Sequence, residues 1–156
     1  MTNGQSDLLK GLSPDQATQV LSLGTRITLT SGAELFHMGT PADNIYLVSQ
    51  GRIKLTLPMR IRGLQQDVFV EERSPGETVG WSALIPPHQF TLTATAPLQT
   101  EVFAISGEAL RAHCDAFPAI GYAISVNLAA VVGQRLQLFQ AMWLREMERM
   151  VELRCA

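Results

Sequence analysis

GETVGWSALIPPHQFTLTATA, residues 76–96, is the most informative stretch of this 156-residue chain. It combines glycines, a short helix-like run and two prolines, a composition that lets a backbone close tightly around a small group. It contains neither arginine nor lysine. The loop therefore has the form of a binding site but lacks the side-chain cations that a phosphate group would require.

Short apolar and β-branched runs lie on both sides of this loop, between about residues 25 and 105. Turn-forming residues separate them, and Ile53, Leu55 and Leu57 alternate with a period of two. Because no helix-length segment interrupts the runs, the pattern favours a small antiparallel roll over a parallel α/β sheet. Pro58, inside one run, indicates an edge strand or a bulge.

Helices are expected before and after the roll. Ser13, Pro14 and Gln16 have the spacing of a capped helix start, which predicts a short helix over about residues 14–23. After the roll, two helices are expected over residues 106–153, the first capped by Ser106. The chain is thus expected to be one domain, residues 1–156, that is mainly β with flanking helices.

Apolar residues in the last helix, which Pro118 is expected to open, follow the four-and-three spacing of a coiled-coil seam, broken only at Glu146. The flanking positions are polar, so the apolar stripe is narrow, and a long helix of this kind usually needs a partner helix. We therefore expect a homodimer through this helix. The expected seam residues are Val132, Leu136, Phe139, Trp143, Met150 and Leu153.

The composition disfavours several classes of partner. A net charge of −2 and an isoelectric point near 5.9 give no general attraction to nucleic acid. Cys114 and Cys155 lack the spacing of a zinc site or a disulfide framework, which favours a reducing cytoplasm. The N-terminus does not resemble a signal peptide, and residues 119–134, nearly uncharged, are shorter than the roughly 20 residues of a membrane span. Neither nucleic acid nor a membrane is expected as a partner.

The order of these elements resembles the cyclic-nucleotide-binding domain of catabolite-activator-type bacterial regulators. The resemblance implies an eight-strand, jelly-roll-like β-roll over about residues 25–105 with a short N-terminal helix and a long C-terminal dimerisation helix. It places residues 76–96 in the phosphate-binding cassette of that family. The segments that carry it are LFHMGTPADNIYLVSQGRIKL (35–55), SPGETVGWSALI (74–85) and TLTATAPLQTEVFAI (91–105).

The resemblance also implies which side chains would read a ligand. Trp81 stands where the family has the glutamate that binds the ribose hydroxyl, and Phe90 where it has the arginine that binds the cyclic phosphate. The cassette amides can attract an anion by about 0.3–2 kcal/mol, whereas a buried charge without its partner costs about 3–5 kcal/mol. Ordinary binding of cyclic AMP is therefore expected to be weak or absent. The candidate ligand contacts are Gly80, Trp81, Ser82, Ala83, Leu84, Phe90 and Thr91.

Two interpretations of this cassette stay open. In one, the rings of Trp81 and Phe90 line a site for a small apolar or aromatic ligand. In the other, the rings fill the roll and nothing binds. His88 either approaches a phosphate or lies in an exposed loop. Arg60 and Arg62 share one strand face and could in principle supply the missing cation, but a solvated outer face is favoured for them.

Cofactors, metals and catalysis find little support. No cysteine precedes Cys114, which excludes the iron-sulfur variant of the superfamily, and the histidines lack the short spacing of a cupin metal site. Glu71 and Glu72 are adjacent on a strand and so face opposite sides, which argues against a shared acid-base site. Haem is disfavoured because its candidate ligands have no specific spacing; they are His37, Met38, His88, His113 and Cys114.

The sequence thus predicts a cytoplasmic, cyclic-nucleotide-binding-like sensor or regulatory module that is not an enzyme. In transcription factors of the family the long helix leads into a DNA-binding module, whereas this chain ends at Ala156. We therefore expect it to act through a separate protein partner. The alternatives are a ligand-free dimeric interaction module and a sensor of a different small ligand. The sequence names neither the ligand nor the partner.

Overall fold

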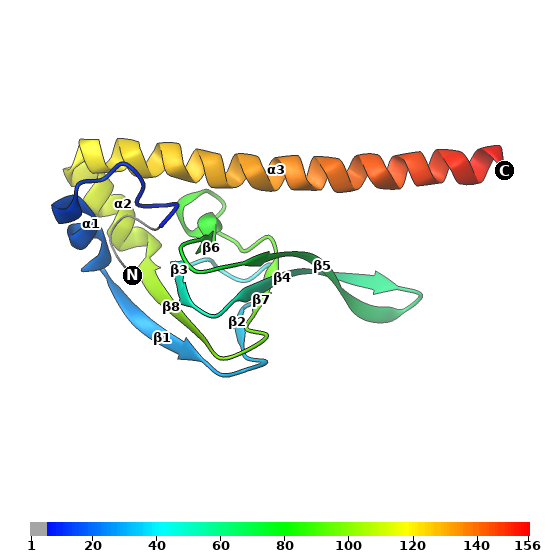
Figure 1. Cartoon of the computed structure of the whole chain (residues 1–156), viewed down its shortest axis with the longest axis horizontal. Coiled ribbons are helices and arrows are strands. Elements are labelled where there is room, and N and C mark those ends of the chain that lie inside the picture. Colours follow the sequence, from blue (N-terminus) through cyan, green and yellow to red (C-terminus); the bar gives the residue numbers. More distant parts are fainter. Residues whose placement is uncertain (1–5) are drawn as a thin grey trace.

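Two four-stranded antiparallel sheets form the body of the molecule in the computed structural model, which describes residues 6–156 (Figure 1). The strand orders are β1-β8-β3-β6 and β2-β7-β4-β5. Residues 1–5 of the expected domain lie outside the described part. The strands are β1 (Gly24–Leu29), β2 (Glu34–Phe36), β3 (Asn44–Gln50), β4 (Ile53–Ile61), β5 (Leu64–Arg73), β6 (Thr78–Val79), β7 (Thr93–Thr95) and β8 (Thr100–Ser106).

The helices flank this roll as the sequence predicts. They are α1 (Pro14–Leu21), the 3-10 helix η1 (Trp81–Leu84) within the cassette loop, α2 (Gly107–Ala116) and α3 (Pro118–Cys155). Ser13 and Gln16 form the expected reciprocal cap, since each backbone amide donates to the other's side chain, at 3.0 and 3.2 Å. The mainly β fold class with flanking helices is confirmed, with α1 ending slightly earlier than expected.

The core joins both sheets to the helices. Ile45, Tyr46, Leu47 and Val48 of β3 are all buried, which departs from the alternation of a strand with one solvated face. Apolar residues of the helices belong to the same buried cluster: Val20 of α1, Leu110 of α2, and Ile120 and Ile124 of α3. The first half of α3 is therefore part of the domain rather than an appendage.

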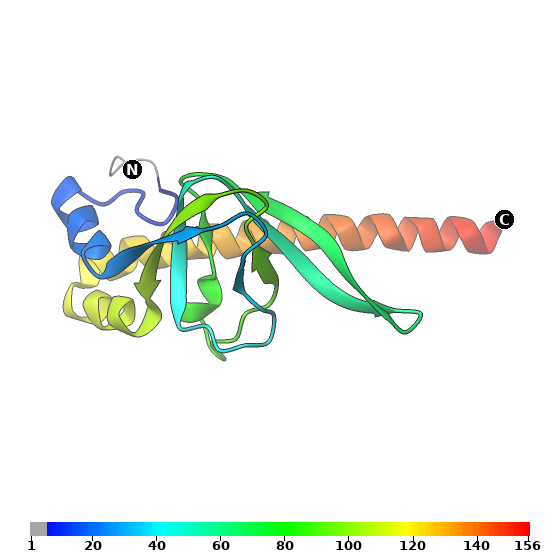
Figure 2. The ribbon, with the colours of Figure 1, turned by 90° about the horizontal axis from the view of Figure 1, so that it is seen from below.

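The second half of α3 extends beyond the roll, and the β4–β5 hairpin projects in the same general direction (Figures 1 and 2). β4 pairs with β5 along its whole length but with β7 only at Lys54–Thr56. Pro58 thus lies where β4 has a free edge, and a register shift falls nearby between Leu55 and Thr56. The expectation of an edge or bulge is confirmed, because a residue without an amide hydrogen is tolerated there.

α3 is, among residues 6–156, the one helix whose length and apolar composition would allow it to cross a membrane. This is weak evidence for a membrane span, because a core helix of a soluble protein passes the same test. Ile120, Ile124 and Val131 of this helix are buried within the domain. Its apolar character is thus partly explained by packing against the roll.

The contact between η1 and α2 can be tested with two glycines. A Cβ at Gly107 would lie 2.6 Å from the carbonyl oxygen of Ala83, whereas a Cβ at Gly133 would meet nothing within 4 Å. Gly107→Ala is expected to lower the free energy of unfolding by about 1–3 kcal/mol in urea denaturation, because backbone must shift. Gly133→Ala, the control, should leave it unchanged or raise it by about 0.5–1 kcal/mol. Equal stability of the two variants would show that η1 and α2 are not tightly packed.

Candidate functional site

The cassette loop turns sharply at Gly80, which joins β6 to η1. Gly80 has a φ of 77°, in the left-handed region that glycine favours. A Cβ here would also lie 3.1 Å from the carbonyl oxygen of Asn44 and 3.2 Å from the Phe90 ring. Both the backbone conformation and the crowding therefore require a glycine at this position.

The second half of the loop is held by the segment that precedes β3. The Phe90 amide donates to the Thr40 carbonyl at 3.0 Å, and the Phe90 carbonyl accepts from the Gly39 amide at 2.8 Å. The His88 carbonyl accepts from the Ala42 amide at 2.8 Å. These bonds fix the direction in which Phe90 enters the roll.

Aromatic rings fill the interior of the roll behind the cassette. The Phe36 and Phe90 rings stack with their centroids 3.8 Å apart and nearly parallel, and the Tyr46 ring also stacks against Phe36, with the centroids 5.9 Å apart. Phe90 is only 6% exposed. The cavity that remains has a volume of about 10 Å³, which is roughly the space of one water molecule.

Five of the seven predicted cassette contacts line this small cavity: Gly80, Trp81, Ser82, Phe90 and Thr91. Ala83 and Leu84 do not. Ala83 is fully buried and its carbonyl accepts from Arg111, whereas Leu84 packs against the core. The ligand-binding role of all seven residues stays a prediction.

His88 lies between exposed residues of the loop, but it is not itself fully exposed, and it does not line the cassette cavity. It is half-buried, and its Nδ1 lies 3.2 Å from the Ser82 carbonyl oxygen of η1. Its φ of 57° is unusual for a residue with a side chain. The structure thus gives His88 a contact that supports η1 from outside the roll, and corrects the interpretation of a solvated loop histidine.

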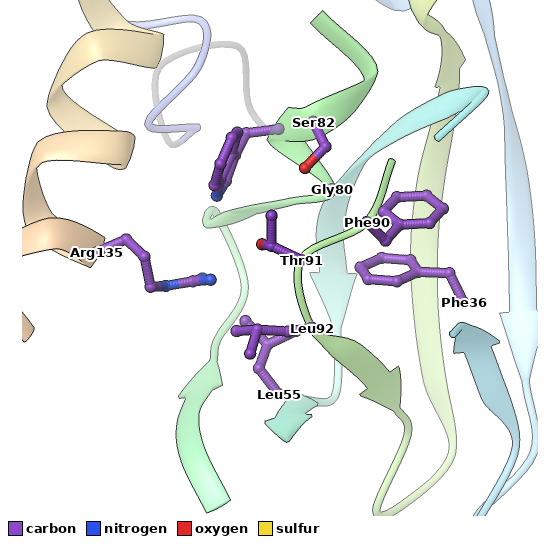
Figure 3. Close-up of a pocket in the computed structure, with 9 residues that line it drawn as sticks. Phe36, Leu55, Gly80, Ser82, Phe90, Thr91, Leu92 and Arg135 are labelled. Carbon is purple, nitrogen blue, oxygen red and sulfur yellow. The ribbon is translucent and has the colours of Figure 1, made fainter. Parts of the chain in front are cut away.

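The cavity is also lined by an arginine, Arg135, which the sequence did not assign to this site. Arg135 reaches from α3 towards Thr91, on the side of the cavity away from the Phe36 and Phe90 rings (Figure 3). As one of the polar residues that flank the predicted seam, Arg135 would be expected at the surface, but it is only 6% exposed. A signal was present, because Arg135 continues the stripe of Ile124 and Val131 that faces the core.

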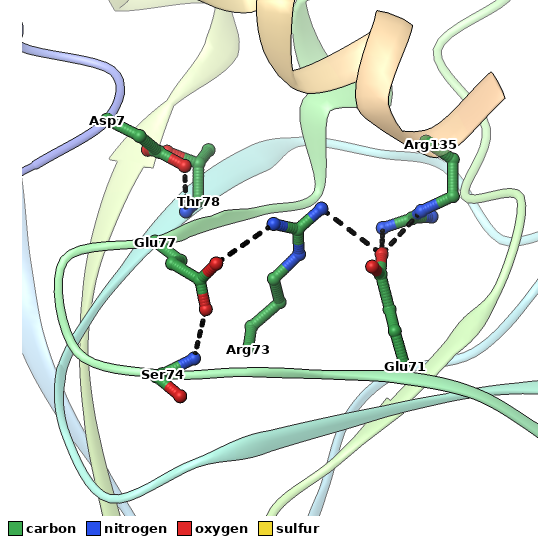
Figure 4. A network of polar contacts seen from close by, with 7 residues as sticks. All are labelled: Asp7, Glu71, Arg73, Ser74, Glu77, Thr78 and Arg135. Carbon is green, nitrogen blue, oxygen red and sulfur yellow. Dashed lines mark hydrogen bonds and ion pairs between the residues drawn. The ribbon is translucent and has the colours of Figure 1, made fainter. Parts of the chain in front are cut away.

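Arg135 belongs to a network of buried charges between β5 and α3 (Figure 4). One oxygen of Glu71, Oε1, accepts from Arg135 Nε at 2.5 Å and pairs with Arg135 Nη2, and it also accepts from Arg73 Nη2 at 3.1 Å. Arg73 Nη1 donates to Glu77 at 3.2 Å, and the Ser74 amide donates to the other oxygen of Glu77 at 2.6 Å. Two guanidinium groups thus share one carboxylate oxygen.

The cations of this network are more deeply buried than the anions. The side chains of Arg73 and Arg135 are 4% and 7% exposed, against 20% for Glu71 and 38% for Glu77. Burial lowers the pKa of Arg135, the Glu71 carboxylate raises it, and the neighbouring Arg73 lowers it. Nε of Arg73 is buried without a hydrogen-bond partner among the described residues. The site therefore has a positive interior and a partly hydrated negative rim.

The expected seam on α3 divides into two parts. Leu136, Trp143, Met150 and Leu153 are exposed, with 68% of Leu136 and 62% of Trp143 accessible. Phe139, by contrast, packs against the core of its own roll. Most of the predicted seam is thus available to a second chain, whereas Phe139 contributes mainly to its own domain. Dimerisation through these residues stays a prediction.

The side chains considered as haem or metal ligands do not lie together. Nδ1 of His37 lies 3.3 Å from Glu34 on an exposed surface, and the tilted rings of His113 and Phe117 lie against each other in the α2–α3 corner. Within residues 6–156, His, Cys, Asp and Glu side chains form no group of three or more that could hold a metal ion. Glu71 and Glu72 face opposite sides as expected, since Glu72 pairs with Arg52.

Comparison with known proteins shows to which family this fold belongs. The sequence model of the cyclic nucleotide-binding domain matches residues 26–117, more than half of the chain. This chain belongs to the cyclic nucleotide-binding domain family. The family consists of regulatory domains rather than enzymes.

The chain is also similar to individual proteins and solved structures of this type. The chain is 28% identical over 132 residues to the cyclic AMP receptor protein of Thermus thermophilus, covering 85% of this chain and 58% of that protein. The catabolite activator protein structure from Thermus thermophilus matches with a TM-score of 0.71 and 27% identity, over 95% of this chain and 62% of that one. The N-terminal domain of a transcriptional regulator from Streptomyces coelicolor has the same fold, with a TM-score of 0.71, 24% identity and coverage of 92% and 95%.

Adjacent glutamates offer a test of the charge network in this family member. Glu71→Gln would leave Arg73 and Arg135 next to each other without a shared carboxylate, so it is expected to lower the free energy of unfolding by about 3 kcal/mol. Glu72→Gln removes only an exposed pair with Arg52 and should cost less than about 1 kcal/mol. Urea unfolding measures both. A similar, small cost for the two variants would show that the network contributes little.

Proposed function

We propose that this chain is a dimeric regulatory domain whose cassette does not take up cyclic nucleotides. The observation that carries the proposal is the stack of Phe36 and Phe90, which leaves a cavity of about 10 Å³. A binding site for a small molecule such as a cyclic nucleotide usually has a volume of a few hundred Å³ or more. A nucleotide could enter only if Phe90 left the core.

The chemistry of the cassette supports the same proposal. The resemblance to the family implies that Trp81 and Phe90 stand at the positions that bind the sugar and the phosphate, and neither ring can replace a carboxylate or a guanidinium. Displacing Phe90 would also cost the several kcal/mol that burial of a large aromatic side chain contributes. Of the two interpretations of the cassette, the filled roll is therefore favoured over a site for an apolar ligand.

The position of α3 supports a function that needs no nucleotide. Arg135 and Glu71 tie the helix to β5 through charge-assisted hydrogen bonds within the chain itself. This pairing fixes the first half of α3 on the roll. The exposed apolar residues of the predicted seam then remain available to a second chain. In this proposal the domain pairs in the cytoplasm through α3 and presents its surface to a separate protein partner.

The nucleotide part of the proposal is tested by isothermal titration calorimetry. Cyclic AMP and cyclic GMP are expected to give no binding heat at micromolar concentrations with the natural chain. The double variant Trp81→Glu, Phe90→Arg restores both family side chains and unstacks Phe36, so it should bind cyclic AMP at least about ten-fold more tightly. Micromolar binding by the natural chain would refute the proposal.

The dimer is tested by sedimentation equilibrium. Leu136→Glu places a charge on an exposed part of the predicted seam and is expected to produce monomers, because an unpaired charge in a helix interface is strongly unfavourable. Leu144→Glu, on the same helix but outside the seam, is the control and should remain dimeric. An unchanged dimer in the Leu136 variant would contradict the seam assignment.

A further inference from the structure

We propose that a polar pocket between the cassette loop and α2 binds a small zwitterionic amino acid. The pocket has a volume of about 380 Å³, which lies in the range of sites for small molecules. It shares no lining residue with the cassette cavity, so it is a second site that does not depend on the filling of the roll. The lining residues are Ala42, Asp43, His88, Ser106, Glu108 and Arg111.

Three segments that are distant in sequence form this pocket. They are residues 42–43 before β3, the cassette loop at His88, and residues 106–111 at the start of α2. Backbone hydrogen bonds join them, because the Ala42 amide donates to the His88 carbonyl and the Gly107 amide donates to the Asp43 carbonyl, both at 2.8 Å. The backbone around the pocket is therefore held in place by the fold itself.

The pocket contains opposite charges that do not neutralise each other. Asp43 and Glu108 supply carboxylates, and Arg111 supplies a guanidinium. Within residues 6–156, none of these three side chains forms an ion pair. The pocket thus keeps acceptors for an ammonium group apart from donors for a carboxylate, as a ligand that carries both charges requires.

Arg111 is oriented by one hydrogen bond and has further donors to offer. Its Nη1 donates to the Ala83 carbonyl of η1. A guanidinium has five N–H donors in a fixed fork, so this bond leaves donors that can bind a carboxylate. The carboxylate of the ligand is therefore expected at Arg111, with the bond to Ala83 retained.

The ammonium group of the ligand is expected at Asp43 and Glu108. Two carboxylates and one guanidinium line the pocket, so negative charge is in excess when the imidazole is neutral. The other polar side chains already have contacts, since Nδ1 of His88 lies 3.2 Å from a carbonyl of η1 and Ser106 caps α2. An ammonium donates three hydrogen bonds and accepts none, which suits a wall with two carboxylates.

The size and lining of the pocket favour an amino acid with a short side chain. Ala42 is the only apolar residue in the lining, so a large apolar side chain would find little to pack against. Asp43, Glu108 and Arg111 are exposed, and water screens ion pairs at such positions. Binding is therefore expected at millimolar rather than micromolar concentrations.

The test is a titration of the full chain with glycine, L-alanine and L-serine, each followed in ¹H–¹⁵N spectra. The amide resonances of Asp43, His88 and Glu108 are expected to shift saturably. The amide resonance of Leu64, at the far end of the β4–β5 hairpin, should not move. Absence of a saturable shift with all three amino acids would overturn the proposal.

Two analogues test whether the pocket reads both charges. L-Alaninamide lacks the carboxylate and N-acetyl-L-alanine lacks the ammonium group, so each is expected to bind at least about three-fold more weakly than L-alanine. Because both analogues are salts, sodium chloride at the same concentration is the blank. Binding of either analogue as tight as that of L-alanine would refute a zwitterion site.

Four variants separate the pocket from general effects of charge. Glu108→Gln and Arg111→Gln each remove one charge from the pocket and should weaken L-alanine binding about three- to ten-fold. Glu148→Gln and Arg145→Gln make the same changes on the second half of α3 and should leave binding unchanged. If Arg111→Gln loosens η1 and does not fold, the exposed Glu108 decides, and unchanged binding in its variant would contradict the proposal.

This proposal and the proposed function can fail separately. Cyclic AMP binding together with the response to L-alanine would refute the filled cassette but leave the amino-acid pocket in place. Absence of both responses would refute the pocket and leave the filled cassette in place.

Discussion

The Glu71 carboxylate holds together the two parts of this molecule. It lies on β5, yet it accepts hydrogen bonds from Arg73 of its own strand and from Arg135 of α3. Two buried guanidinium groups repel each other, and the shared Glu71 carboxylate offsets this repulsion. This contact adds a polar link between β5 and α3 to the apolar packing of Ile120 and Ile124 against the roll.

The cassette and the charge network are complementary features of one site. In the cassette, an aromatic ring at Phe90 stacks on Phe36 and closes the interior of the roll. The positive charge that the loop lacks is supplied by Arg135, from a helix more than forty residues further along the chain. The family fold is thus retained, and in this chain a buried arginine of α3 lines a small cavity behind the cassette.

Local sequence patterns were sufficient for much of the fold. Ser13 and Gln16 predicted the helix cap that the structure contains, and Pro58 predicted the free edge of β4, because caps and proline act over a few residues. The aromatic character of Trp81 and Phe90 was equally readable, and with it the expectation of an altered cassette. The stacking of Phe90 on Phe36 was not readable, because these residues are distant in sequence and meet only across the roll.

Arg135 shows the difference between what the sequence predicts and what only the tertiary structure reveals. By itself the sequence determined a capped, mainly β domain of this family, with a glycine-framed loop free of basic residues and a long helix with an apolar stripe. The tertiary structure alone decided that one arginine of that helix faces inwards, meets Glu71 and lines the cassette cavity. The physical reason is that helical periodicity fixes which residues share a face, whereas the rotation of α3 against the roll is set by packing and by the pairing of buried charges.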